Sequence, residues 1–468
     1  MQSKSVQARP VRSELMQSDW RADLTASETD RTYNTRYLDP ADINVVAGYG
    51  IEVFSYGLNE PVNMLFTESG NLIVAETGEV SGDPRVLQMV NNNFEVIAEG
   101  FDQAITGVNY LDGFLYVSHR GRVLRVSRNG VKQDIITGLP SNGDHYNGKV
   151  VFSADRRKLY FGQGTATNSG VVGQDNVWVM EHPILCDYPG EYITLIGQNF
   201  ETRDDSNQVA PGEIVQTGAF SLYGIPNLPY ETRKAYVKAS GSVLVANIDG
   251  TSLEIYSWGF RNPLNLGFND RGQLYVANRG YDNRGSRPIA NAPDEFFAVN
   301  PDLWYGWPDY SGGNPVTLPR FTPEGRKSPE LLLESLPNVP LEPFVTFPSS
   351  SNIMGFAFDY TNFGTYGDVY ITEYGSVDFE RSHESVSYAG VGHRVSKIDM
   401  KTRTVSTFAI NKSGFPTHIS QEGGFGRPVD IAFGPDQAMY VLDMGIADSE
   451  NPNLILPYTG VIWRIYKL

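Results

Sequence analysis

One pattern of apolar and polar positions recurs along this chain from Ile43 onward. A short apolar run is followed by a turn rich in Gly, Asp or Asn, and a second run then ends in Tyr-Val-Ala or a similar triplet. Two β-rich runs joined by such a turn predict a β-hairpin. The copies begin at Pro61, Ile105, Asn147, Pro263, Ile353 and Pro428, and they read PVNMLFTESGNLIVAETG, ITGVNYLDGFLYVSHRG, NGKVVFSADRRKLYFGQG, PLNLGFNDRGQLYVANRG, IMGFAFDYTNFGTYGDVYITEYG and PVDIAFGPDQAMYVLDMG.

Further strand-like runs follow each hairpin. The third runs are RVLQMV, RVLRVS, VLVANID, EFFAVN, RVSKIDM and VIWRIYKL, and several copies add a fourth, such as FEVIAEG or VSTFAI. Six repeats of a four-stranded antiparallel sheet predict an all-β fold, a six-bladed β-propeller. The last copy ends at the C-terminus after its third run, so IEVFSYG at residues 51–57 is predicted to be its fourth strand and to close the ring. A β-sandwich with a second domain is the alternative.

The same pattern sets the predicted domain limits. Residues 1–42 are polar and aperiodic and are predicted to form a tail or a wrapping arm, whereas residues 43–468 are predicted to form the propeller. The irregular spacing of the copies indicates long insertions at about 181–241 and 304–346. Gly and Pro number 47 and 28, which suits the many turns that six blades need.

Composition and charge exclude several classes of protein. With 40% apolar residues the chain can form a core, which a disordered chain cannot. Cys186 is the single cysteine, so no disulfide can form within the chain. A net charge of −17 opposes binding to nucleic acid. No apolar run reaches the roughly 18 residues of a membrane span. The N-terminal residues also lack the apolar core of a secretory signal, so we expect none in this chain.

Polar residues precede each predicted innermost strand, where a propeller gathers them around one mouth of its channel. Convergent polar groups at such a mouth are the default site hypothesis. His145 is the natural general base among them, and Arg261 and Arg427 suit a carboxylate or a developing oxyanion. Asp144 is not assumed to orient His145, because neighbouring side chains of an extended segment point in opposite directions. The full set is Asn59, Glu60, Asp102, Gln103, Thr106, Asp144, His145, Asn147, Arg261, Asn262, Ser349, Ser350, Ser351, Asn352 and Arg427.

The residues alone leave three functions open. The same polar groups cap loops in many proteins, so a propeller that binds carbohydrate or protein without catalysis is one hypothesis. A calcium-dependent lactonase is another, since channel oxygens from Glu60, Asn147, Asn262 and Asn352 suit a calcium ion. The third is an enzyme that uses His145 as its base.

The chain resembles the glucose/sorbosone dehydrogenase family, the soluble quinoprotein sugar dehydrogenases, over roughly residues 50–468. The segments that carry the resemblance are DHYNGKVVFSADRRKLYFG, SWGFRNPLNLGFNDRGQLYVANRG, WYGWP, PSSS at 348–351 and GRPVDIAFGPDQAMYVLD. It implies a six-bladed propeller that oxidises the C1 hydroxyl of an aldose by hydride transfer to pyrroloquinoline quinone (PQQ), with calcium beside the quinone. A sugar substrate, an electron acceptor that the resemblance does not identify, and a periplasmic or extracellular location are implied as well.

The resemblance also implies roles for individual residues. His145 matches the base of the family, and Arg261, Asn262 and Arg427 match residues that contact the quinone. Gln103 and Asp144 are assigned to the substrate side, and the backbone carbonyls of Gly280 and Tyr281 to calcium.

The sequence departs from the family pattern at several of these places. Leu264 stands where a Gln is expected, Asn278 opens a segment that usually reads Glu-His-Gly-Pro, and Val429 replaces a second arginine. The Asp expected after the LYFG strand is absent, so the strength of quinone binding is open.

Overall fold

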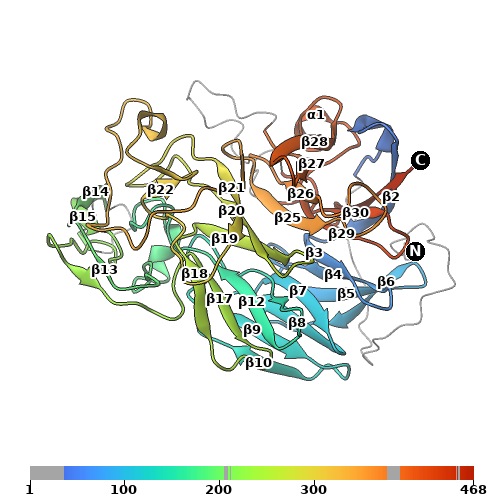
Figure 1. Cartoon of the computed structure of the whole chain (residues 1–468), viewed down its shortest axis with the longest axis horizontal. Helices are drawn as coiled ribbons and strands as arrows, with labels where there is room; N and C mark the ends of the chain where they lie inside the picture. The colour runs from blue at the N-terminus through green and yellow to red at the C-terminus, as the bar shows by residue number, and fades with distance from the viewer. Residues whose placement is uncertain (1–35, 205–208, 211, 377–390, 449–450, 452–453) are drawn as a thin grey trace. The chain divides into compact units, whose positions relative to one another are not determined.

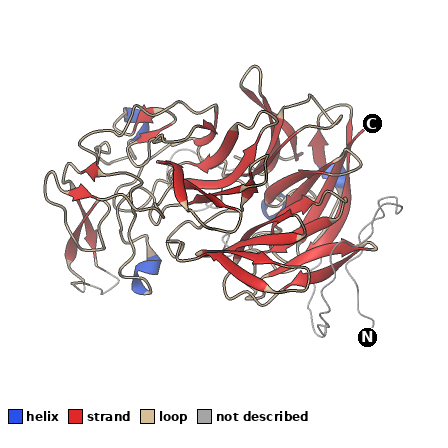
Figure 2. Ribbon diagram, turned by 60° about the horizontal axis from the view of Figure 1, so that its bottom comes forward, coloured by secondary structure: helices blue, strands red, loops and turns tan. Residues whose placement is uncertain are grey.

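The computed structural model describes residues 36–468 apart from 205–208, 211, 377–390, 449–450 and 452–453. The described residues are mostly in strands and loops, as Figure 2 shows, and their helical segments are short. These segments are α1 (Thr417–Ser420) and the 3₁₀ turns η1 (Pro40–Asp42), η2 (Val177–Met180) and η3 (Pro319–Phe321). Most of the tail predicted for residues 1–42 lies outside the described residues.

The chain divides into two compact units. The first comprises Met1–His119, Val123–Asp134 and Ser351–Leu468, and the second comprises Arg120–Arg122 and Ile135–Ser350.

Four antiparallel sheets belong wholly or almost wholly to the first unit, and Figure 1 labels most of their strands. In sheet order they are β3 (Pro61–Phe66), β4 (Leu72–Glu76), β5 (Arg85–Val90) and β6 (Asn93–Ala98); β7 (Ile105–Leu111), β8 (Phe114–His119), β9 (Arg122–Val126) and β10 (Lys132–Ile136); β25 (Ile353–Phe358), β26 (Val369–Glu373), β27 (Arg394–Asp399), β28 (Thr404–Asn411) and β1 (Ile43–Val45); β29 (Pro428–Phe433), β30 (Met439–Asp443), β31 (Gly460–Lys467) and β2 (Tyr49–Leu58).

The local sequence explains these hairpins. Between β7 and β8, Asp112 and Gly113 both have positive φ, 50° and 84°, as the two central residues of a tight hairpin turn require. Strand β4 reads LIVAE and is buried at all five positions, because neighbouring sheets cover both of its faces. A continuous apolar run is therefore the pattern of a central strand here, in place of strict alternation.

Buried polar contacts join the first strands of neighbouring sheets in the first unit. One Asp430 carboxylate oxygen in β29 accepts hydrogen bonds from the Asn63 side chain and from the Met64 amide, the latter at 3.0 Å. The amide oxygen of Asn63 in turn accepts from the Val108 amide of β7 at 2.8 Å. β29, β3 and β7 thus carry a continuous polar link through an otherwise apolar core.

The N-terminal strands complete two sheets of this unit. β2 pairs antiparallel with β31, from Tyr49 opposite Lys467 to Leu58 opposite Gly460, which confirms the predicted closing strand. β1 adds a fifth strand to its sheet by pairing with β28, a feature that the sequence pattern did not predict. Arg36 also binds this unit, since its guanidinium contacts the Asp443 carboxylate at 2.8 Å.

The second unit holds two more four-stranded sheets and both insertions. The sheets are β11 (Val151–Phe152), β12 (Lys158–Gln163), β17 (Ser242–Asn247) and β18 (Glu254–Trp258), and then β19 (Asn262–Phe268), β20 (Leu274–Arg279), β21 (Asp294–Val299) and β24 (Val345–Phe347). Between β12 and β17 lie β13 (Ile193–Thr194), β14 (Asn199–Arg203), β15 (Ile214–Gly218) and β16 (Thr232–Arg233), and between β21 and β24 lie β22 (Tyr310–Ser311) and β23 (Asn314–Pro315).

An aromatic core supports the insertions. Trp258, Trp304 and Trp307 are almost fully buried and pack in one cluster with residues of both insertions. Below them a buried ion pair joins Arg287 to Asp309 at 3.0 Å, and Asp309 also accepts the amides of Leu332 and Leu333. The WYGWP segment is therefore part of the core.

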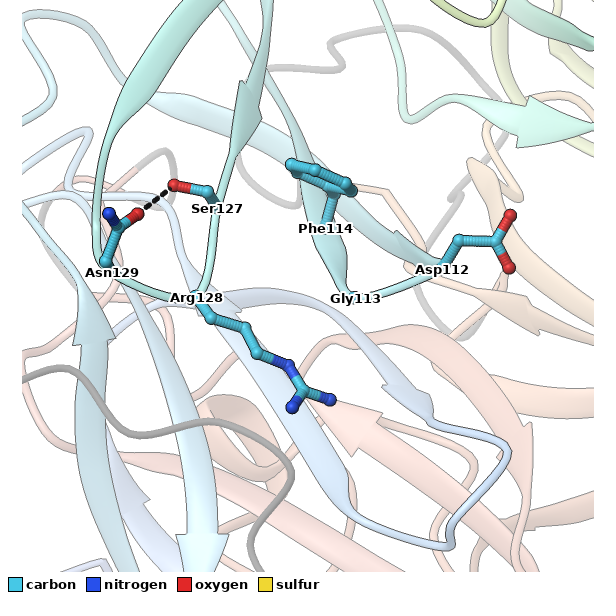
Figure 3. A pocket seen from close by; sticks show the side chains of 6 residues that line it. All are labelled: Asp112, Gly113, Phe114, Ser127, Arg128 and Asn129. Carbon is cyan, nitrogen blue, oxygen red and sulfur yellow. Dashed lines mark hydrogen bonds between the residues drawn. The ribbon is translucent and has the colours of Figure 1, made fainter.

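The five four-stranded sheets and the sheet that β1 extends to five strands are the blades of a six-bladed β-propeller, so the fold class predicted from the repeats is confirmed. The domain limits at residues 42 and 43 stay a prediction. An open hollow of about 470 Å³ lies between the Asp112–Gly113 and Ser127–Asn129 turns of the second blade. Figure 3 shows its side chains, and it lies at the end of β7 opposite to the predicted mouth.

Candidate functional site

His145 and the predicted residues beside it, Asp144 and Asn147, lie on one of two adjacent antiparallel segments. Residues 144–148 run antiparallel to 162–166, through amide contacts such as Asp144 to Ala166 and Gly148 to Gly162. A β-carbon on Gly164 would lie 2.4 Å from Cβ of His145 and 3.0 Å from Oδ1 of Asn262. Glycine at this position therefore lets His145 and Asn262 approach one another from either side.

His145 is buried, and its proton position follows from its partners. Its Nδ1 lies 3.0 Å from the carbonyl oxygen of Thr165 and 3.1 Å from the hydroxyl oxygen of the same residue. The hydroxyl donates its hydrogen to the Thr167 carbonyl at 2.6 Å, so both Thr165 oxygens face Nδ1 as acceptors. Nδ1 therefore carries the proton, and Nε2 keeps its lone pair in the neutral imidazole.

The surroundings keep His145 neutral. Burial, followed by the charges of Arg261, Arg279 and Arg284, lowers its pKa well below the ordinary value. At neutral pH the imidazole is thus a proton acceptor through Nε2. A base with this protonation state is ready to take a hydroxyl proton.

Arg261 and Asn262 are fixed from the backbone outward. Both of their amides donate to Oδ1 of Asn278, at 3.1 and 2.9 Å, and the Asn278 amide group donates to Glu295 at 2.7 Å. Arg261 donates through Nη1 to the Gly280 carbonyl at 2.6 Å. Its Nε and the Oδ1 of Asn262 are buried without a hydrogen-bond partner. Buried unsatisfied atoms of this kind indicate a site that a ligand completes.

A charged network surrounds these residues. Asp282 accepts from Arg261 at 2.5 Å and from Arg284 at 3.2 Å. Arg284 also binds Asp144 at 2.7 Å and Asp175 at 2.5 Å, so one guanidinium contacts three carboxylates. Burial favours the neutral form of Asp282, but Arg261 and Arg284 outweigh it and hold the pKa of this carboxyl well below its usual range.

Asp144 does not contact the His145 ring. Besides Arg284, its carboxylate accepts from Trp178 Nε1 at 2.7 Å and from the Asn176 side chain at 3.0 Å. Asp144 and His145 are therefore adjacent in sequence, but their side chains contact different residues, as expected for an extended segment. The role of Asp144 toward a substrate stays a prediction.

Two buried carboxyl groups lie behind the site. Asp187 accepts from the Ala166 amide at 2.6 Å and from the Thr167 hydroxyl at 2.5 Å, and burial raises its pKa to about 6. Glu295, which holds Asn278, has a pKa raised to about 7 by burial. Both carboxyls support segments that position the site residues.

In the first unit, Arg427 is fully buried before β29. Its Nη1 donates to the Ser376 carbonyl at 2.7 Å and its guanidinium lies 4.8 Å from the ring centre of Tyr374, whereas its Nε and Nη2 have no hydrogen-bond partner. Val429, where the resemblance implies a second arginine, is buried in the apolar core. Gln103 is exposed in the turn before β7, and its substrate role stays a prediction.

The predicted calcium ligands are the backbone carbonyls of Gly280 and Tyr281. The carbonyl of Gly280 accepts from Nη1 of Arg261 at 2.6 Å, and the role of the Tyr281 carbonyl stays a prediction. Of the lactonase candidates, the Asn147 side chain binds Ser141 and the Arg122 carbonyl, and Asn352 binds the Gly375 carbonyl. Among the described residues, no three His, Cys, Asp or Glu side chains form a group that suits a metal ion.

The structure thus brings His145, Asp144, Arg261, Asn262 and Gly280 together in one unit, through Gly164 and the Arg261–Asp282–Arg284 network. Sequence analysis missed Thr165, Asp175, Asp187, Asp282 and Arg284 as site residues. Asp282 and Arg284 lie just after VANRG, the end of a predicted strand, and this position is the sequence signal that indicates them. Thr165, Asp175 and Asp187 belong to an aperiodic segment that offers no such signal.

None of the helices in the described residues has the length and hydropathy that a membrane crossing needs.

Comparisons with known proteins give a weak sequence match and a clear match of fold. No protein-family model matches the chain. Quinoprotein glucose dehydrogenase B of Acinetobacter calcoaceticus is 23% identical over 181 residues, which are 38% of this chain and only 29% of that relative. The match thus spans less than a third of the relative's length.

Solved structures cover nearly the whole chain at low identity. The PQQ-bound aldose sugar dehydrogenase of Streptomyces coelicolor has a TM-score of 0.51 at 15% identity, over 90% of this chain and 99% of that one. The calcium structure of a carbohydrate-active enzyme of family AA12 from Trichoderma reesei has a TM-score of 0.57 at 14% identity, over 93% and 99%. The chain therefore has the propeller fold of the soluble quinoprotein sugar dehydrogenases, the family that its motifs resemble.

Proposed function

We propose that this protein is an oxidoreductase that oxidises the C1 hydroxyl of an aldose-type sugar, with PQQ as hydride acceptor and His145 as general base. The observation that carries the proposal is a buried, neutral imidazole beside Arg261 and Asn262, whose buried polar atoms lack protein partners. The partial match to a quinoprotein glucose dehydrogenase and the likeness to a PQQ-bound aldose sugar dehydrogenase support this class of cofactor and substrate.

His145 has the proton placement that the reaction needs. Nδ1 is held by Thr165, so Nε2 accepts the proton of the C1 hydroxyl while the hydride leaves C1 with its electron pair. When bound, PQQ would supply the two-electron acceptor that the oxidation of an aldose to a lactone requires. The proton on His145 then passes to solvent, because the low pKa makes the imidazolium a ready donor.

The described residues fit an anionic quinone. PQQ carries carboxylates, and the buried side chains of Arg261 and Asn262 each have a polar atom, Nε and Oδ1, without a hydrogen-bond partner. The role of Arg427 toward the quinone stays a prediction from the sequence resemblance.

The same residues, as they are arranged, do not fit a calcium ion. Nη1 of Arg261 occupies the Gly280 carbonyl, and Asp144, Asp175 and Asp282 are all paired with arginines. A divalent ion at that carbonyl would lie close to the Arg261 guanidinium, whose positive charge opposes it. No step of the proposed reaction is therefore derived through calcium, although one neighbour of the same fold was solved with it.

Quinone titration followed by absorbance, with and without calcium, tests the proposal. We expect a saturable spectral change and dye reduction that requires an aldose. His145→Ala should keep the spectral change but lower kcat by roughly 10²–10⁴-fold, the usual contribution of a general base. His182→Ala is the matched control, because His182 lies in the insertion and its side chain has no assigned role at the site; it should keep full activity.

Three outcomes contradict the proposal. The absence of both a spectral change and dye reduction with any aldose would overturn it. Glycan binding that persists in His145→Ala, without dye reduction in the unmodified protein, would favour a carbohydrate-binding propeller. Hydrolysis of a lactone with calcium alone would favour the lactonase.

A further inference from the structure

The imidazole of His145 is held by a backbone carbonyl and a hydroxyl, and in the described part of the chain its Nδ1 contacts no carboxylate. In an imidazole base of this kind the partner of Nδ1 decides which nitrogen keeps the lone pair. A contact that fixes the position of the Thr165 carbonyl therefore also fixes which nitrogen of His145 can act as the base.

Thr165 connects the two halves of the candidate site. Its carbonyl accepts the His145 amide at 3.2 Å as well as Nδ1, while its own amide donates to the Arg261 carbonyl at 3.0 Å. Its hydroxyl donates to the Thr167 carbonyl, which closes a tight loop over residues 165–167. The orientation of His145 relative to Arg261 thus depends on this loop.

Asp187 anchors the loop from the insertion. Its two carboxylate oxygens accept from successive residues, Oδ1 from the Ala166 amide at 2.6 Å and Oδ2 from the Thr167 hydroxyl at 2.5 Å. Asp187 is 2% exposed, and its hydrogen-bond partners, the Ala166 amide and the hydroxyls of Thr167 and Ser240, are neutral groups. A buried carboxylate without a cation is destabilising in itself, so the contacts of Asp187 with the 165–167 loop point to a positioning role.

We propose that Asp187 is a positioning residue for His145: it fixes the 165–167 loop, so that the Thr165 carbonyl holds the proton on Nδ1 and Nε2 remains the proton acceptor. The proposal rests on the proposed function for its catalytic consequence only. The Nδ1–H tautomer itself is a property of the protein without cofactor or substrate.

Nuclear magnetic resonance of protein labelled with ¹⁵N histidine tests it directly. The chain has six histidines, so the signal of His145 can be assigned by its loss in His145→Gln. We expect the Nδ1–H tautomer in the unmodified protein. In Asp187→Ala, the freed Ala166 amide and Thr167 hydroxyl release the loop, so we expect a mixture of tautomers and a kcat about tenfold lower at unchanged KM, less than the loss of the base itself.

Two matched variants separate positioning from stability. Asp187→Asn should preserve the Nδ1–H tautomer, because its Oδ1 still accepts the Ala166 amide and the Thr167 hydroxyl can rotate to accept from the new NH₂. Asp309→Ala removes another fully buried carboxylate of the same unit, which binds Arg287 and the amides of Leu332 and Leu333. It should lower the melting temperature and leave the tautomer of His145 unchanged.

The groups that face His145 must be considered when its pH titration is interpreted. They are Arg261, Arg279, Arg284 and Asp282, none of which these variants alter.

An Nε2–H tautomer in the unmodified protein, or an unchanged tautomer and kcat in Asp187→Ala, would overturn the proposal. If the tautomers behave as expected but no quinone binds, the proposed function fails and the positioning role stands.

Discussion

At the scale of single residues, the candidate site is marked by polar atoms that are buried and incompletely bonded. Most buried polar atoms in proteins have a partner. Here the Nε of Arg261 and the Oδ1 of Asn262 have none, although the backbone around both residues is held firmly by Asn278. Rigid backbone with unsatisfied side-chain atoms is the arrangement of a preorganised ligand site.

Glu295 gives a pH-dependent prediction at this scale. Burial raises its folded-state pKa to about 7, above the unfolded value of roughly 4.3. Its stabilising contribution is therefore fully present below pH ~4.3 and is lost as the pH rises through about 7. Glu295→Gln does not titrate, so we expect the free energy of unfolding of the unmodified protein, relative to this variant, to fall by roughly 3 kcal/mol between pH 4.5 and pH 8.

Denaturant titrations of both proteins at several pH values measure this difference. The comparison with Glu295→Gln cancels the titration of other groups, because they are shared. A difference that is constant with pH, or that grows in favour of the unmodified protein as pH rises, would contradict the raised pKa.

At the scale of elements, the blades are joined by buried polar contacts as well as by apolar packing. Asp430 in β29 and Asn63 in β3 are 1% and 3% exposed, and together they satisfy the amides of Met64 and Val108. These residues fix the register of one inner strand against the next. Apolar contacts alone do not specify such a register, because they are not directional.

Removal of Asn63 tests this link. Asn63→Ala leaves the Val108 amide without its acceptor and Asp430 with one donor fewer, in a site too buried for water to replace them freely. We expect a loss of roughly 2–6 kcal/mol in the free energy of unfolding, at about 1–3 kcal/mol for each of the two groups. Chemical denaturation measures it, with the exposed Asn93→Ala as control; equal stability of the two variants would contradict the role of Asn63.

At the scale of the whole molecule, strands from the two ends of the chain share one sheet. β31 lies between β30 and β2, and its residues Trp463 and Ile465 are fully buried. β2 therefore protects β31 from being an edge strand with open hydrogen-bonding groups.

Deletion of residues 1–58 removes β2 together with β1 and leaves β31 at an edge. We expect the truncated protein to aggregate on size-exclusion chromatography and to lose the cooperative thermal transition of the full chain. Glu52→Gln, which removes only the surface ion pair between Glu52 in β2 and Arg464 in β31, should behave as the full chain does. A truncated protein that stays monomeric with an unchanged melting temperature would show that the closing strand is dispensable.

The sequence by itself determined the repeated blades and their closing strand, because the apolar runs, the turn residues and the order of the strands are local properties that recur in each copy. It also indicated His145, Arg261, Asn262 and Arg427, since each of them precedes the predicted innermost strand of its copy, a position that the repeat defines. Only the tertiary structure decided how these groups are held. Thr165, Asp187 and Arg284 act through contacts between aperiodic segments, such as Asp187 with Ala166 and Arg284 with Asp144. Such contacts depend on how the insertion packs against the blade, and that packing leaves no periodic signal along the chain.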